Sequence, residues 1–199
     1  MKTAAFAMLL MATTGLLVLG CSDNSTPVVS PTDQSATVTG PLGKVEIREF
    51  TSTAGPDPAF VVLDPGFQKS ADGKMVVRGL VEKSVFNATF ADGETDLLSG
   101  NGVLELNYTV DLVAGEMMGW GKLTITPTAP EANGGVWEIG WKGPGWFVEN
   151  VGWVTAAKMI GRGRGGAING MQLNATLNLV TWEIPFGWTG TGNGCIKSH

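Results

Sequence analysis

The sequence predicts an all-β protein: a single small antiparallel β-barrel of about eight strands, preceded by a signal peptide and a disordered tether. Three observations support this fold class. From Lys44 onward, apolar and polar residues alternate with a period of two. Turn residues interrupt the alternation about every 10 to 20 positions, and no stretch of the domain has a helical period with caps. Because open strand edges promote aggregation, so many antiparallel strands must close into a barrel or fold into a sandwich.

Residues 1–20 have the organisation of a signal peptide. Lys2 supplies a positive charge, and the apolar run from Ala4 to Leu19 is short for a membrane-spanning helix. The run ends in Leu17-Val18-Leu19-Gly20-Cys21, which resembles the lipobox of bacterial lipoproteins. This resemblance implies cleavage before Cys21, a diacylglyceryl group on its thiol and a fatty acid such as palmitate on the new amino terminus. The alternative is an ordinary secretory signal with an incidental cysteine.

We expect residues 21–43 to consist of a lipidated cysteine followed by a flexible linker rich in Ser, Thr and Pro. The linker has too few apolar residues to offset the entropy of ordering it. We therefore expect an exported protein that the lipid on Cys21 holds on a membrane. Ser22 favours the outer membrane, on its periplasmic or surface side, if the host is Gram-negative. The folded domain is expected to span residues 44–199.

The net charge and the small numbers of histidines and cysteines argue against several functions. Without residues 1–20 the chain has 12 basic and 18 acidic residues, a net charge of −6. The sequence indicates no basic patch or run, which argues against nucleic acid and against electrostatic lipid binding. The single histidine is the last residue, His199, so the usual catalytic base and the commonest metal ligand are missing. No cofactor or metal is predicted. Lipidation of Cys21 would leave Cys195 as a free thiol or an intermolecular bridge, with a small buried residue favoured.

Six segments of the domain carry the period-two pattern. Residues between the apolar positions, Glu82 and Glu138 among them, are expected to face water. The expected apolar faces are Val45 and Ile47; Met75, Val77, Gly79 and Val81; Leu104, Leu106, Tyr108, Val110 and Leu112; Leu123 and Ile125; Trp137, Ile139 and Trp141; and Met171, Leu173, Ala175, Leu177 and Leu179.

Glycines within the strands favour closure into a barrel, because they let strands bend sharply while large aromatic side chains cover the bare backbone. The five Gly-Trp pairs suit this arrangement, and their irregular spacing argues against a propeller or solenoid repeat. The strand glycines in question are Gly79, Gly121, Gly140, Gly143 and Gly163.

Several motifs lie between Val76 and Ile196, about two-thirds of the expected mature chain. They are Val76-Val77-Arg78-Gly79, Leu98-Ser99-Gly100-Asn101-Gly102, Gly119-Trp120-Gly121-Lys122-Leu123, the run from Gly135 to Gly143, Gly161-Arg162-Gly163-Arg164-Gly165-Gly166, and Ile168-Asn169-Gly170-Met171-Gln172-Leu173. Together they resemble the allene-oxide-cyclase-like barrel family of uncharacterised bacterial proteins. Plant enzymes of this fold cyclise an unstable epoxide inside an apolar barrel without a cofactor. None of their catalytic residues can be matched to a position of this chain.

Four residues are candidates for ligand binding. Trp137 and Trp141 could line an apolar pocket, although core packing also explains buried tryptophans. Arg162 and Arg164 share one face of a strand and could hold an anion. The favoured alternative is that the two arginines form surface pairs with Glu138, Glu149 or Glu183. The spacing Gly161-x-Gly163-x-x-Gly166 matches a dinucleotide motif by letter, but no helix is expected after it.

Two functional hypotheses follow. The first is a non-catalytic, lipid-anchored envelope protein that binds a small hydrophobic ligand or interacts with an envelope protein. The second is a cofactor-free cyclase or isomerase that acts on a small hydrophobic substrate inside the barrel. An enzyme would need an open cavity with a buried carboxylate, Arg or Tyr at its floor, whereas a barrel filled by large side chains leaves surface recognition.

Overall fold

The structure is a computed structural model that describes residues 38–40, 43–91, 93, 95–182 and 187–198. The expected signal peptide, Cys21 and most of the expected linker lie outside these residues. The described strands are β1 (Val38–Gly40), β2 (Gly43–Pro56), β3 (Val62–Asp64), β4 (Phe67–Ala71), β5 (Lys74–Phe90), β6 (Gly100–Asp111), β7 (Glu116–Pro127), β8 (Val136–Val148), β9 (Gly152–Arg164), β10 (Gln172–Thr181) and β11 (Trp188–Ser198). Two 3-10 helices, η1 (Pro130–Ala132) and η2 (Gly166–Ile168), join them.

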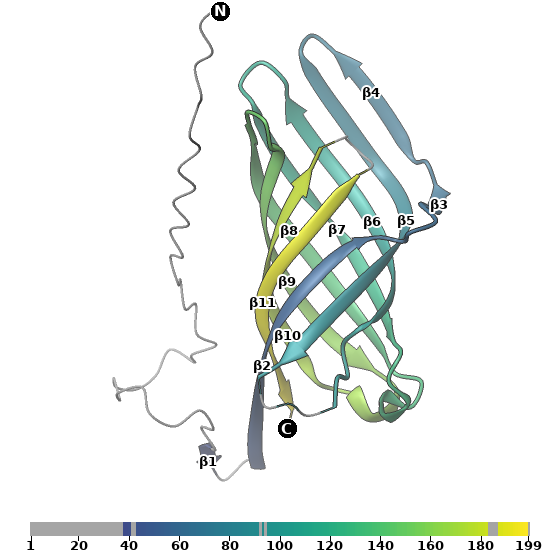
Figure 1. The fold of residues 1–199 in the computed structure, drawn as a ribbon, viewed down its shortest axis with the longest axis vertical. Helices are drawn as coiled ribbons and strands as arrows, with labels where there is room; N and C mark the ends of the chain where they lie inside the picture. Colours follow the sequence, from purple (N-terminus) through teal and green to yellow (C-terminus); the bar gives the residue numbers. More distant parts are fainter. Residues whose placement is uncertain (1–37, 41–42, 92, 94, 183–186, 199) are drawn as a thin grey trace, which may run out of the picture.

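Eight antiparallel strands close into a barrel, which confirms the predicted fold class (Figure 1). Strands β5 to β11 pair in chain order, and β2 pairs with β11 on one side and β5 on the other. β2 reaches β5 only from Phe50 to Pro56, opposite Phe90 to Ser84. The short strands β3 and β4 pair with the rest of β5, so they cover the edge that β2 leaves open.

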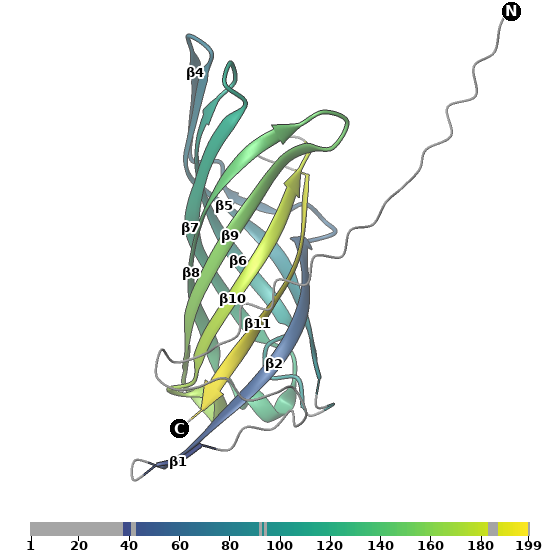
Figure 2. The ribbon, with the colours of Figure 1, turned by 90° about the vertical axis from the view of Figure 1, so that its left-hand side faces the viewer.

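The two ends of the barrel are built differently (Figure 2). At one end lie the turns of the β4–β5, β6–β7 and β8–β9 hairpins, and we call this the hairpin end. There the Phe147 amide donates to the Gly115 carbonyl at 2.8 Å, which joins the β8–β9 hairpin to the β6–β7 turn. The opposite end carries the start of β2, the end of β11, and η1 and η2.

The apolar faces expected for β6, β7, β8 and β10 point into the barrel. Trp137, Ile125 and Val110 are fully buried, and the exposed fraction of Leu173 is 1%. The same alternation leaves Glu138 exposed, as expected. The last residue of the β6 pattern, Leu112, differs because it lies in the turn at the hairpin end and is 51% exposed.

The expected faces of β2 and of the second half of β5 are wrong. In β2 the barrel buries Phe50 and Ser52, whereas Ile47 is 38% exposed. In β5 the pairing with β6 shifts between Val77 and Leu80, and Gly79 in this bulge has φ = 65°, the left-handed region that glycine favours. The inserted residue reverses every later side chain, because strand side chains alternate with a period of two. Leu80 and Glu82 therefore point inward.

The expected aromatic cover is present at Gly121 but absent at Gly79 and Gly140, and the atoms nearest to a Cβ at Gly143 and Gly163 are not aromatic. A Cβ atom at Gly121 would overlap the Glu105 carbonyl oxygen and lie 2.7 Å from the indole nitrogen of Trp141. At Gly119 it would lie 3.0 Å from the Trp141 ring and 3.1 Å from the Tyr108 ring. The Trp141 ring therefore occupies the space that side chains would fill along the inner face of β7, so these glycines are required by packing.

Candidate functional site

A small polar cluster of Glu82, Ser84, Tyr108 and Trp188 lies inside the apolar barrel. Glu82 is only 4% exposed, and its carboxylate accepts a hydrogen bond of 2.5 Å from the Trp188 indole nitrogen. Ser84 follows on the same face of β5, and Thr155 faces inward from β9. Among the described residues, the hydroxyls of Ser52, Ser84 and Thr155 are buried without a hydrogen-bond partner. Sequence reasoning missed this cluster because it placed Glu82 on the outer face.

Burial changes the pKa values of two groups in this cluster. It raises the pKa of the Glu82 carboxyl, and the hydrogen bond from Trp188 offsets part of the rise. Burial also raises the pKa of the Tyr108 phenol, and the nearby charge of Glu82 raises it further. A carboxyl in this position holds its proton to a higher pH than an exposed one, so the cluster could in principle donate a proton.

The space beside this cluster is small. An internal cavity of about 30 Å³ lies between Ser84, Tyr108, Trp141 and Trp188. Since a water molecule needs roughly 10–15 Å³, the cavity has room for about two or three waters. Large apolar side chains, including Phe86, Leu106 and Met159, fill the remainder of the barrel. The interior in this form does not hold a drug-sized ligand.

The two predicted tryptophans belong to the filled interior. Trp137 is fully buried, and its indole nitrogen donates to the Leu97 carbonyl at 2.9 Å. Trp141 is 6% exposed, lines the small cavity and donates to the Glu105 carbonyl at 3.3 Å. Both indole N–H groups therefore have acceptors, as core packing requires.

The two predicted arginines lie on the outside of the barrel, away from the tryptophan rings. Arg164 forms an ion pair of 3.0 Å with Glu138, the surface pair that the sequence favoured. Arg162 is exposed opposite Glu138 in the β8–β9 register. The fold therefore does not bring Trp137, Trp141, Arg162 and Arg164 into one site.

Strand pairing creates a basic patch that the sequence did not reveal. Lys142 on β8 lies directly opposite Lys158 on β9, and both side chains are exposed. Lys122 on the outer face of β7 is two register positions away, opposite Gly140. Within the described part of the chain, these three lysines have no ion-pair partner. The expectation that no basic patch exists is therefore wrong, because residues far apart in the sequence meet across the strands.

This patch borders an outer groove of about 610 Å³. Trp120 and Met118 of β7 form one wall, and Ile160 of β9, which is 66% exposed, lies on the other side. Gly140 of β8 lies between them. The groove is wide open to solvent, so a ligand in it would be only partly buried.

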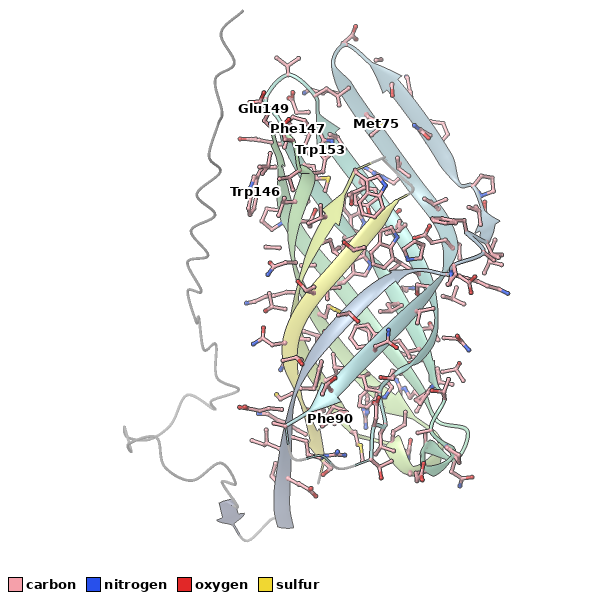
Figure 3. All side chains as sticks on the ribbon, in the orientation of Figure 1. Met75, Phe90, Trp146, Phe147, Glu149 and Trp153 are labelled. Atoms are coloured by element: carbon pink, nitrogen blue, oxygen red, sulfur yellow. The ribbon has the colours of Figure 1, made fainter. Side chains whose placement is uncertain are left out.

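A third candidate surface lies at the hairpin end. Figure 3 shows Trp146, Phe147 and Trp153 gathered there, far from Phe90 near the opposite end. The exposed fractions of Val113 and Phe147 are 86% and 54%, although both side chains are apolar. Further exposed apolar side chains at this end are Leu112, Trp146, Val151 and Trp182. A concentration of this kind marks an interaction surface more often than scattered single residues do.

Cys195 is buried, as expected, with 1% of its surface exposed, and it is disulfide-bonded, so the free-thiol alternative is wrong while the other alternative, an intermolecular bridge, stays a prediction. The other cysteine of the chain is Cys21, which lies outside the described residues. A sulfur that carries a thioether-linked lipid cannot also form a disulfide. Lipidation of Cys21 and a bond from Cys21 to Cys195 therefore exclude each other.

The described residues contain no group of three or more His, Cys, Asp or Glu side chains that could hold a metal ion. In the same part of the chain, no helix is long and apolar enough to cross a membrane. No family model, curated protein or solved structure matches this chain. The resemblance to the allene-oxide-cyclase-like barrel stays a prediction.

Proposed function

We propose that this chain is a lipid-anchored envelope protein that acts as a non-catalytic interaction module, with its hairpin end as the contact surface. The observation that carries the proposal is the distribution of apolar side chains. The interior is filled to a cavity of about 30 Å³, while Val113, Phe147 and Trp146 are exposed together at one end. A filled barrel supports surface recognition rather than storage of a small hydrophobic ligand.

The contact surface can be tested with a photo-crosslinking amino acid placed at Val113 or Val151 of the full chain in its own envelope. We expect a discrete adduct with one envelope protein from both positions. Thr126, exposed on the outer face of β7 near the opposite end, is the control position. An adduct of equal yield from Thr126, or none from the hairpin end, would contradict the proposal.

The anchor is tested separately by intact mass spectrometry of the protein purified from membranes without reductant. Lipidation predicts loss of residues 1–20 and a mass increase from a diacylglyceryl group on Cys21. An unmodified chain that loses two hydrogens on forming a Cys21–Cys195 disulfide would overturn the anchor. It would leave the crosslinking test of the hairpin end in force, because that surface does not depend on the lipid.

A second candidate is the cofactor-free cyclase or isomerase, and the buried Glu82 beside Tyr108 is the observation that favours it. A substrate would have to displace packed side chains, because the cavity lined by Tyr108 and Trp188 has room for waters only. Native mass spectrometry of the mature chain purified from its own envelope tests this candidate. A bound hydrophobic molecule in repeated preparations would support it, and its absence from all of them would count against it.

A further inference from the structure

Gly140 is a glycine that the fold does not require. Its φ is not in the left-handed region, and a Cβ atom there would meet only the Ile160 carbonyl oxygen, at 4.0 Å. A strand glycine lowers the free energy of unfolding by roughly 0.5–1 kcal/mol relative to alanine. At this position no close contact requires the glycine. Its effect is to leave the floor of the outer groove bare, since the glycine lies between Lys122 and Ile160 in the strand register.

The charges of Lys142 and Lys158 repel each other and so lower the stability of the folded protein. They face each other directly across β8 and β9, and like charges in this position destabilise a strand pair. Neither nearby carboxylate pairs with them, because Glu138 forms its ion pair of 3.0 Å with Arg164, and Glu105 lies opposite Lys122 and accepts from the Asn107 amide at 3.2 Å. An anion between the two ammonium groups would relieve the repulsion.

The apolar wall of the groove is held in place. The guanidinium of Arg78 lies 4.5 Å from the ring centroid of Trp120, and the same group donates to the Tyr108 carbonyl at 2.6 Å. One face of the indole is therefore fixed by an anchored cation, which reduces the entropy lost when a ligand packs against the rest of the ring. Met118 extends this wall toward the hairpin end, with 37% of its surface exposed.

We propose that the outer groove binds the head of an anionic phospholipid. The phosphate lies between Lys142 and Lys158, and the adjoining acyl region packs along Trp120, Met118 and Ile160. Two unpaired cations beside apolar surface match a molecule in which negative charge and hydrocarbon are neighbours. A free inorganic anion would leave the apolar walls in water, and a zwitterionic head would bring its own cation toward the lysines. This site is distinct from the hairpin-end surface and does not depend on the lipid at Cys21.

The experiment measures binding of dihexanoylphosphatidylglycerol, below its micelle concentration, to the chain from Cys21 onward produced without residues 1–20. Isothermal titration calorimetry gives the dissociation constant. We expect K142Q and K158Q each to weaken binding about tenfold, and the double variant about a hundredfold, because each removes a charge-assisted contact. Gly140→Val should weaken binding at least tenfold by filling the floor, without lowering the melting temperature.

Matched controls separate this site from general charge and from folding. The variant K69Q/K83Q removes two exposed lysines on β4 and β5 and should bind as the parent does. Dihexanoylphosphatidylcholine and inorganic phosphate should bind at least tenfold more weakly than the anionic lipid. Equal binding of either probe, equal loss in K69Q/K83Q, or unchanged binding in K142Q/K158Q would overturn the proposal. None of these results would alter the crosslinks expected from Val113.

Discussion

Gly121 and Gly140 lie one register position apart on neighbouring strands, but they face opposite sides of the barrel wall. On the inside, Trp141 covers Gly121 so closely that no other residue fits. On the outside, Gly140 borders open space and two unpaired lysines. Inside the barrel, the glycine therefore serves packing. On the outer face, the absence of a side chain at Gly140 leaves space in the groove, and we infer that the proposed lipid occupies this space.

The largest effect on stability is expected for Gly121→Ala, which tests how tightly the inner face of the barrel wall is packed. The added Cβ would overlap the Glu105 carbonyl oxygen and crowd the Trp141 indole, so either the β6–β7 pair or the ring must move. We expect a loss of about 3 kcal/mol or more in the free energy of unfolding, as overpacking at a backbone contact produces. Urea denaturation monitored by circular dichroism measures the loss. A change below 1 kcal/mol would show that the inner wall is not tightly packed.

The next variant, Trp188→Phe, removes the indole donor from the buried Glu82 carboxylate. A buried acceptor left without its donor costs about 1–3 kcal/mol, and we expect a loss of about 2 kcal/mol in the free energy of unfolding. Urea denaturation again provides the measurement. The control is Trp146→Phe at the exposed hairpin end, which should change stability by less than 0.5 kcal/mol. Equal losses in both variants would contradict a role for the buried hydrogen bond.

The pH dependence of stability tests whether the pKa of the buried Glu82 is raised. Because burial raises the pKa of Glu82, the folded state binds more protons than the unfolded state just above the ordinary carboxyl pKa. This group's contribution to stability is therefore complete at low pH and is lost as pH rises from the unfolded pKa through the folded one. Thermal denaturation at a series of pH values should show this loss in the parent and not in Glu82→Gln. A parallel pair of profiles would mean that Glu82 does not titrate abnormally.

The smallest effect is expected for Gly140→Ala, the outer counterpart of Gly121→Ala. The new methyl group enters open space, so the change should raise the free energy of unfolding by about 0.4–1 kcal/mol through the unfolded state. Urea denaturation of both alanine variants in parallel gives the contrast between the two faces. A clear destabilisation by Gly140→Ala would remove the argument that this glycine is kept for the groove.

The alternation that predicts strands is a local property, and it placed most of the core correctly. Trp137, Ile139 and Trp141 face inward because side chains of one strand alternate between its two faces. The same reasoning failed at Glu82, because one extra residue at the Gly79 bulge reverses the rest of β5. The glycine in the printed sequence is compatible with a bulge but does not reveal it, since strand glycines elsewhere in the chain keep a regular register.

The candidate sites were less accessible to sequence reasoning than the fold. Trp141 and Arg162 were proposed as one ligand site, but the barrel wall separates a buried ring from an exposed guanidinium. Lys142 and Lys158 drew no attention, because fifteen intervening residues separate two isolated lysines in a chain of negative net charge. Only the pairing register sets them opposite each other.

By itself, the sequence determined the all-β class, the approximate number of barrel strands and the inner face of most of them, because these follow from period-two alternation and turn residues. The tertiary structure decided what lies in the barrel and on its wall. A bulge directed Glu82 inward, close packing reduced the interior to a cavity of about 30 Å³, and strand register assembled the groove around Gly140. These features depend on contacts between residues far apart in the chain, which local patterning does not encode.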